Sequence, residues 1–284
     1  AGRGQEPGEI AGGSRRRAGD NSQIAHTMKT LIIFARAPFL GQVKTRLARC
    51  RAIGKNRALT LYRAFLEDTF VLATRTCAES IAIHFSPHGA EEDMRQILHG
   101  LLLGVREEGR FTFVPQVEGS FHKKIAASFH HAGRMGGEDL VIIGADSPMI
   151  RPEVVDEAFD FIHECSGMAL GPSGEGGLYL IGFERGTPID FSTVFDSGSE
   201  MENMLAQAVA GNIPLRVLPE TLDVDVEADL TGLLGLLRAA EYLRRSNKDL
   251  YIPEHTLHVV NSMRLCVVRK GGETRGKRIA VDRG

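Results

Sequence analysis

The chain has 284 residues, of which 43% are hydrophobic and 25% are charged, an ordinary balance for a globular protein with one large or two small domains. Lys and Arg number 34 against 36 Asp and Glu, and the formal charge of -2 argues against a general polyanion binder, so we expect no nucleic-acid partner. No apolar stretch approaches the roughly 20 residues that cross a bilayer, and the four separated cysteines lack CxxC spacing, so we expect a cytoplasmic protein with reduced thiols and no membrane span.

The two ends of the chain differ in composition from its centre. The first 27 residues are rich in Gly, Arg and Ser and predict a disordered N-terminal extension, and a strand pattern begins directly after Met28. Residues 28–245 are expected to form one domain. Residues 246–284 are expected to form a basic C-terminal tail, for which a solvated, weakly ordered end is favoured over a strand pair.

Short apolar runs alternate with segments of helical periodicity along the predicted domain. The expected strands cover residues 29–34, 80–85, 111–114, 141–145, 168–170 and 178–183. The expected helices cover residues 55–77, 91–103, 121–134, 152–165, 200–210 and 228–243. In the first helix, apolar residues at helical spacing, including Tyr62 and Phe65, are interpreted as core and not as a site. The alternation predicts an α/β fold with three layers, αβα, around a mostly parallel central sheet.

The loop after the first strand, residues 35–47, combines the cations Arg36, Lys44 and Arg46 with Gly41. At the carboxyl end of a strand, free backbone N–H groups and cationic side chains can converge on an anion, so this loop predicts phosphate binding. It contains neither a Walker A loop nor a GxGxxG fingerprint. The alternative is that Lys44 and Arg46 are solvated surface cations.

Acidic residues follow two other segments that we expect to end at the same crevice. Asp146 comes directly after a buried strand, where an open α/β sheet places its ligands, and it could hold a divalent cation. Asp223 and Asp225 alternate in an extended segment, so both side chains could point to one side. The alternative for all three is capping of the helices that follow.

A glycine-rich loop, residues 171–179, joins the last two predicted strands. Glycine lets the backbone approach a ligand closely. A plain hairpin is the alternative interpretation of this loop.

Five segments of this chain together resemble one family closely. They are residues 33–38 (IFARAP) with Gly41, residues 43–47 (VKTRL), residues 144–148 (GADSP), residues 176–182 (GGLYLIG), and residues 223–230 with Asp223, Asp225 and Asp229. In this order they resemble a bacterial GT-A-like transferase family, the radical-SAM and selenodomain-associated transferase 1 family, formerly a domain of unknown function. The resemblance covers about residues 28–237. The Lys44-Thr45-Arg46-Leu47 segment is also similar to a Lys-Ser-Arg-Leu segment of phospholactate guanylyltransferases.

The resemblance implies a fold of the nucleotide-diphospho-sugar transferase (GT-A) type and a role for each segment. In such enzymes carboxylates hold Mg²⁺ or Mn²⁺ against a diphosphate, which makes Asp146, Asp225 and Asp223 the expected metal ligands. The nucleotide and its phosphates are expected at Ala35, Arg36, Gly41, Lys44, Thr45 and Arg46. The acceptor or sugar is expected at Glu175, Gly176 and Gly177, where the family commonly has Asp-Gly-Gly-Tyr and this chain has Glu175 and Leu178.

The sequence therefore predicts a metal-dependent transferase that uses a nucleotide-activated donor, with Asp146 and Lys44 as its catalytic residues. Glycosyl transfer from a nucleotide sugar to an unknown small-molecule acceptor is preferred. One alternative is nucleotidyl transfer from a nucleoside triphosphate to a phosphorylated acceptor, with release of pyrophosphate. The other is a non-catalytic nucleotide-binding module, suggested by the altered residues Glu175 and Leu178.

Overall fold

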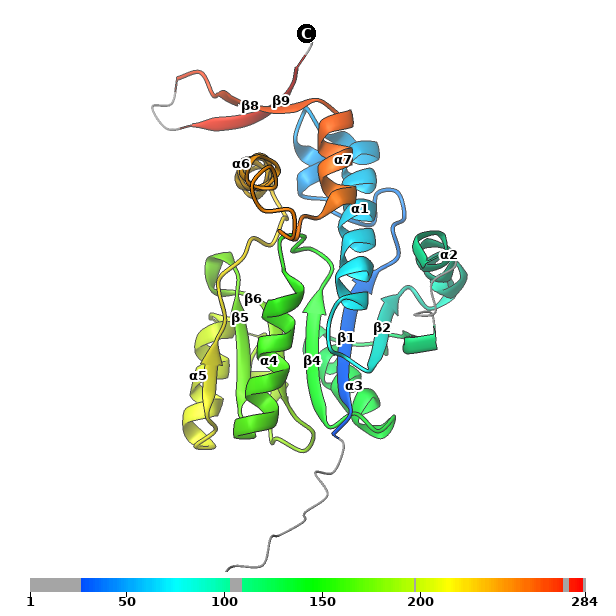
Figure 1. Ribbon diagram of the computed structural model, residues 1–284, viewed down its shortest axis with the longest axis vertical. Helices are drawn as coiled ribbons and strands as arrows, with labels where there is room; N and C mark the ends of the chain where they lie inside the picture. Colours follow the sequence, from blue (N-terminus) through cyan, green and yellow to red (C-terminus); the bar gives the residue numbers. More distant parts are fainter. Residues whose placement is uncertain (1–26, 103–108, 197, 273–275, 283–284) are drawn as a thin grey trace, which may run out of the picture.

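The structure is a computed structural model that describes residues 27–102, 109–196, 198–272 and 276–282. The predicted N-terminal extension, apart from Thr27, lies outside these described residues. The chain folds around a central sheet with helices on both faces and a further group of elements at one end of that sheet (Figure 1).

The central sheet has seven strands within the described ranges, in the order β3-β2-β1-β4-β6-β5-β7. They are β1 (Lys29–Arg36), β2 (Ser80–Ser86), β3 (Phe111–Pro115), β4 (Asp139–Gly144), β5 (Met168–Pro172), β6 (Leu178–Glu184) and β7 (Leu215–Val217). Only β6 runs against its neighbours, β4 and β5, and the remaining pairs in this sheet are parallel. The predicted mostly parallel α/β sheet is confirmed.

Helices cover both faces of this sheet, as the alternating sequence pattern predicts. They are α1 (Gly54–Thr74), α2 (Glu91–Leu102), α3 (Phe121–Arg134), α4 (Pro152–Cys165) and α5 (Glu200–Ala210). Two further helices, α6 (Glu227–Leu243) and α7 (Glu254–Ser262), lie at one end of the sheet, and α7 was not predicted. Within the described residues, no helix combines the length and apolarity needed to cross a bilayer.

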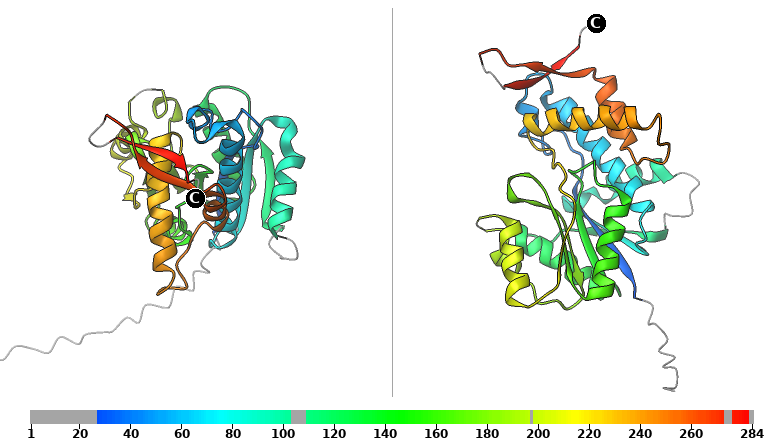
Figure 2. Two further views of the ribbon diagram at one scale, coloured as in Figure 1. Left: turned by 90° about the horizontal axis from the view of Figure 1, so that it is seen from above. Right: turned by 60° about the vertical axis from the view of Figure 1, so that its left-hand side comes forward.

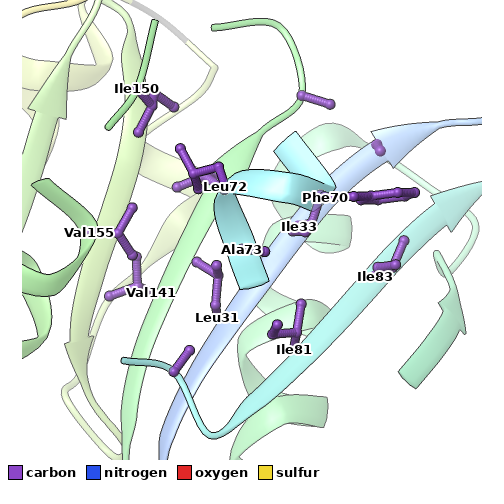
Figure 3. Packing of buried hydrophobic residues seen from close by; sticks show 14 of the residues in the cluster. Leu31, Ile33, Phe70, Leu72, Ala73, Ile81, Ile83, Val141, Ile150 and Val155 are labelled. Carbon is purple, nitrogen blue, oxygen red and sulfur yellow. The ribbon is translucent and has the colours of Figure 1, made fainter. Parts of the chain in front are cut away.

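Successive residues of β1 pack alternately into two separate hydrophobic cores, one on each face of the sheet. Leu31 and Ile33 pack with Phe70 of α1 and Val155 of α4 on one face, as Figure 3 shows. Ile32 points to the other face, where α3 and α5 pack. Because a parallel strand is buried on both faces, its sequence is a continuous apolar run, which is why β1 and β4 could be recognised.

A third hydrophobic core lies at the end of the sheet where β1 and β4 finish. It joins the first half of α1 and α6 to α7 and to a two-stranded hairpin, β8 (Leu265–Arg269) and β9 (Lys277–Val281). The two views in Figure 2 place the hairpin and α7 beside α6 and α1. This core buries Phe65, Leu234 and Leu257 together.

The prediction of a weakly ordered basic tail after residue 245 is wrong for these elements. Ile252, Leu257, Leu265 and Ile279 are buried against α1 and α6, while the basic side chains between them face outward. Burial of these apolar residues supplies the free energy that a solvated tail lacks. The domain boundary at residue 245 stays a prediction.

Candidate active site

The predicted metal ligands and the loop that carries Lys44 lie near the carboxyl ends of β1 and β4. Asp146 follows β4 by two residues, and its carbonyl oxygen accepts a hydrogen bond of 3.0 Å from the Val224 amide. This bond lays the segment before α6 beside the end of β4, so Asp223 and Asp225 flank a backbone that contacts Asp146. One hydrogen bond thus explains how carboxylates that are distant in the sequence meet.

Lys44 lies at the centre of this group. Its Nζ atom is 2.8 Å from Asp146 Oδ1 and donates a hydrogen bond of 2.8 Å to Asp225 Oδ1. Arg46 donates a hydrogen bond to the second oxygen of Asp225. The Lys44 side chain is only 3% exposed, whereas those of Asp146 and Asp225 are 39% and 33% exposed. We name the three carboxylates of Asp146, Asp223 and Asp225 the acidic cluster.

Burial and neighbouring charges shift the pKa values of Lys44, Asp225 and Asp223. Burial favours neutral Lys44, but the carboxylates of Asp146, Asp225 and Asp223 outweigh it and raise the pKa of this ammonium. Burial also opposes ionised Asp225, yet Lys44 and Arg46 lower its pKa overall. Burial and the charge of Asp146 raise the pKa of Asp223 to about 6, against the effect of Lys44. The ammonium therefore stabilises the ionised form of Asp225.

The three carboxylates fit a hard divalent cation. One oxygen from each of Asp146, Asp223 and Asp225 lies within 4.8 Å of the others. Asp223 Oδ1 is shielded from solvent and lacks a hydrogen-bond partner among the described residues, and Asp146 Oδ1 has only its ion pair with Lys44. Oxygens that are buried but not satisfied by donors are suited to ligate Mg²⁺ or Mn²⁺.

Helix capping was the alternative explanation for Asp223 and Asp225. The residue that caps α6 is Asp229 instead. Asp229 Oδ2 accepts hydrogen bonds of 2.8 Å from the backbone amides of both Asp225 and Val226. Asp229 therefore satisfies the amides at the start of α6. The side chains of Asp223 and Asp225 remain available to the acidic cluster.

A pocket of about 250 Å³ opens at the carboxyl ends of β1, β2 and β3. Its lining combines cationic, amide and hydroxyl groups: Arg36, Ala37, Gln42, Ser86, Pro87, His88, Gln116, Val117, Glu118 and Lys124. Gln116 Nε2 donates hydrogen bonds to the carbonyls of Ala35 (3.0 Å) and His84 (2.9 Å), which ties the ends of β1 and β2 together. A larger hollow of about 410 Å³ between α2 and β3 contains none of the predicted site residues.

The predicted phosphate-binding residues divide between these two places. Arg36 lines the pocket, and the buried Ala35 contributes only the carbonyl that accepts a hydrogen bond from Gln116, a lining residue. Lys44 is buried against Asp146 and Asp225, which removes the alternative that it is only a solvated cation, whereas Arg46 contacts Asp225 with a side chain that is 61% exposed. Gly41 and Thr45 are exposed in the connecting loop. At Gly41 (φ +76°) and Lys44 (φ +46°) the backbone is left-handed, so the loop turns sharply between the pocket and the acidic cluster.

The glycine-rich loop is a single turn of 3-10 helix (Gly174–Gly176) between β5 and β6. Glu175 is exposed and outside the acidic cluster, and its φ is +61°. Ser199, at the start of α5, donates a hydrogen bond of 2.9 Å to the Gly176 carbonyl. Ser173 pairs with Thr221, two residues before Asp223, so the loop begins beside the segment that carries the acids.

Sequence reasoning missed two residues that support the site. Tyr62, interpreted as core, accepts a hydrogen bond from the Arg36 amide and donates one to the Arg36 carbonyl, both 2.9 Å long. Gln116 was not considered. The signal for Gln116 was its place directly after a parallel strand, at the edge of the sheet where Arg36 and Asp146 also lie. A tyrosine in an apolar helical stripe gives no comparable signal.

The arrangement of strands and helices belongs to the class of α/β folds found in nucleotide-diphospho-sugar transferases. A crystal structure of a provisionally named nucleotide-diphospho-sugar transferase from Desulfovibrio desulfuricans G20 has a TM-score of 0.67 and 23% sequence identity, over 83% of this chain and 96% of that chain. This similarity confirms the predicted GT-A-type fold. Residues 70–198 match the model of a family described as an uncharacterized protein conserved in bacteria (DUF2064), in agreement with the resemblance noted in the sequence.

Other solved structures are similar at lower scores. A cytidylyltransferase from Leptospira borgpetersenii serovar Hardjo-bovis (strain JB197) has 11% identity and a TM-score of 0.47, over 83% of this chain and 94% of that chain. A Mycobacterium tuberculosis H37Rv protein in complex with manganese has 17% identity and a TM-score of 0.42, over 74% of this chain and 99% of that chain. No curated protein matches the sequence.

Proposed function

We propose that this protein is a metal-dependent transferase that uses a nucleotide-activated donor. The observation that carries the proposal is the convergence of Asp146, Asp223 and Asp225 on Lys44, at the edge of the sheet that also holds the 250 Å³ pocket. A donor with a nucleoside at one end and phosphates at the other matches this division. The pocket would take the nucleoside, and the acidic cluster with its cation would take the phosphates.

Each group has a distinct task in this proposal. Asp146, Asp225 and Asp223 would hold Mg²⁺ or Mn²⁺, which supplies charge to stabilise the leaving phosphate oxygens. Lys44 and Arg46 would carry positive charge to the same oxygens, and Arg36 at the pocket would contact the donor near its nucleoside. Most of the rate would come from positioning and from charge stabilisation. Glu175, Gly176 and Gly177 would contact the acceptor or the sugar.

Glycosyl transfer from a nucleotide sugar is the preferred reaction, because the fold is that of nucleotide-diphospho-sugar transferases. In that reaction the acceptor attacks the anomeric carbon and a nucleoside diphosphate leaves. Nucleotidyl transfer is the second candidate, favoured by the similarity of residues 44–47 to a guanylyltransferase segment. There a phosphorylated acceptor attacks the α-phosphorus of a nucleoside triphosphate and pyrophosphate leaves.

Calorimetry with a panel of nucleotides and nucleotide sugars, with and without Mn²⁺, tests the proposal when it is followed by product detection. Release of a nucleoside diphosphate supports glycosyl transfer, and release of pyrophosphate supports nucleotidyl transfer. Tight nucleotide binding without turnover of any donor identifies a non-catalytic binding module and contradicts the proposed activity. Turnover that is unaffected by removal of divalent cations contradicts the metal dependence.

A further inference from the structure

Lys44 occupies a place that suits a divalent cation. Its ammonium nitrogen is 2.8 Å from oxygens of both Asp146 and Asp225, and Asp223 also contributes to its pKa. Only 3% of the Lys44 side chain is exposed to solvent. Without a positive charge here, three carboxylates with oxygens within 4.8 Å would repel one another. The folded chain therefore supplies its own cation to its acidic cluster.

The surroundings of Lys44 stabilise this arrangement. The ammonium lies 6.0 Å above the ring of Tyr62, within the range of a cation–π contact. Tyr62 is fixed by its two hydrogen bonds to the backbone of Arg36. Lys44 itself has a φ of +46°, a conformation that a lysine adopts only where its surroundings stabilise it. The ion pairs of Lys44 with Asp146 and Asp225 offset the cost of this backbone conformation.

We propose that Lys44 is a resident counter-ion that competes with the divalent cation for Asp146 and Asp225, and that it leaves these carboxylates when the cation binds. This inference rests on the metal-dependent function proposed above and adds a form of regulation to it. The released ammonium is then free to pair with donor phosphates, so the same lysine neutralises the acidic cluster in the empty site and the phosphates in the loaded one. Metal binding and donor binding are thereby coupled through one side chain.

Amine-reactive acylation of the wild-type protein, read by peptide mass spectrometry, tests the exchange without any substitution. Lys44 should be protected in the metal-free protein, because burial and its ion pairs shield the amine from the reagent. Added Mn²⁺ should raise its labelling several-fold. The exposed Lys55, at the start of α1, serves as the control whose labelling should stay constant. Protection of Lys44 that is unchanged at saturating Mn²⁺ overturns the proposal.

Calorimetric titration of Mn²⁺ into the variant Lys44→Met gives a second, independent readout. Removal of a competing charge next to two ligands should tighten Mn²⁺ binding by at least about tenfold after allowance for solvent screening. The metal-free variant should melt at a lower temperature than wild type, and Mn²⁺ should restore the difference. The matched control Lys55→Met should change neither quantity.

The outcomes separate this proposal from the proposed function. Equal or weaker Mn²⁺ affinity in Lys44→Met than in wild type overturns the exchange, while metal-dependent turnover by wild type would still stand. If neither protein binds Mn²⁺, the metal-dependent function fails and the exchange fails with it. Tighter binding by the variant together with exposure of Lys44 in wild type supports the exchange even if no donor has yet been found.

Discussion

The carboxylate of Asp68, on α1, accepts a hydrogen bond of 2.8 Å from the backbone amide of Thr256, on α7. Its other oxygen accepts one of 3.0 Å from the His255 amide, so Asp68 caps the first turn of α7 from a distant part of the chain. The residue is 2% exposed. An acid buried in this way links the stability of the C-terminal elements to pH.

Asp68 should make the protein less stable as the pH rises from about 4 to 6. Burial raises its pKa to about 6, although the Thr256 and His255 amides oppose the shift. In this window the folded protein binds more protons at Asp68 than the unfolded chain does, so the unfolding free energy falls with increasing pH, by at most about 1.4 kcal/mol per pH unit for one proton. Asp68→Asn should reduce this slope, as measured by urea unfolding at several pH values.

Other groups near Asp68 can be separated from it by their pH windows. The raised pKa of His255, due mainly to its hydrogen bond with Glu67, adds stability that is lost only as the pH rises through that pKa, above 6.5. The lowered pKa of Glu67 adds stability that is lost as the pH falls below about 4.5. An unchanged slope between pH 4 and 6 in Asp68→Asn would show that Asp68 is not the titrating group.

Tyr62→Phe should destabilise the protein and weaken nucleotide binding. The substitution leaves the Arg36 amide and carbonyl without their partner, and a buried polar group without a partner costs about 1–3 kcal/mol. Arg36 would also lose the two hydrogen bonds that fix its backbone at the pocket. Thermal melts and nucleotide calorimetry measure the two effects. Tyr242→Phe, in which the side chain is 67% exposed, is the control and should change neither; equal behaviour of the two variants would contradict the role of Tyr62.

Much of the central sheet could be predicted because its strands are buried on both faces. β1 and β4 appear as continuous apolar runs, and each ends where a site residue follows. β7 could not be recognised, because it is three residues long and only Leu215 is partly buried. The α7 helix was missed, and the β8–β9 strand pair was only the less favoured interpretation, because basic residues such as Arg269 and Lys277 stand beside the buried apolar positions. These elements are stabilised by contacts with α1 and α6, and a local sequence pattern does not reveal such long-range contacts.

The acidic cluster was predictable in membership but not in arrangement. Asp146 and Asp225 were expected together because each follows an element that ends at the same edge of the sheet. The contact of Lys44 with both was not expected, since phosphate was the partner considered for this cation. Side-chain direction in an irregular loop depends on left-handed backbone angles such as that of Lys44, and one sequence does not specify them.

Asp146→Asn should remove the response of the protein to divalent cations. Loss of a residue that only hydrogen-bonds to a metal ligand typically weakens metal binding about 10–100-fold. Loss of a direct ligand should therefore weaken Mn²⁺ binding by at least about 100-fold. Calorimetric titration with Mn²⁺ measures the change, and metal-dependent turnover should fall with it. Asp93→Asn, on the exposed face of α2, is the matched control. Wild-type Mn²⁺ affinity in Asp146→Asn would exclude this residue from the metal site.

Gly176→Ala should strain the glycine-rich loop, whereas Gly174→Ala, two residues away, should not. Gly176 has a φ of +79°, and a Cβ atom there would lie 2.6 Å from Ser199 Oγ. The left-handed backbone alone costs an alanine about 1–2 kcal/mol, and the clash adds to it. A Cβ atom on Gly174 meets no atom within 4 Å, so Gly174→Ala should stay within about 0.5 kcal/mol of wild type in denaturant unfolding.

The double variant Gly176→Ala with Ser199→Gly separates the clash from the backbone strain. Ser199→Gly removes the hydroxyl and the Cβ atom that the new methyl group would meet. Glycine at this helix N-cap costs only a few tenths of a kcal/mol, but the hydrogen bond to the Gly176 carbonyl is also lost, so the single variant Ser199→Gly is the reference for the double variant. The double variant should therefore recover part of the stability lost in Gly176→Ala. The part of the unfolding free energy that is not recovered measures the cost of placing alanine at a positive φ. If the two substitutions add without recovery, contact between the loop and α5 is not what fixes Gly176.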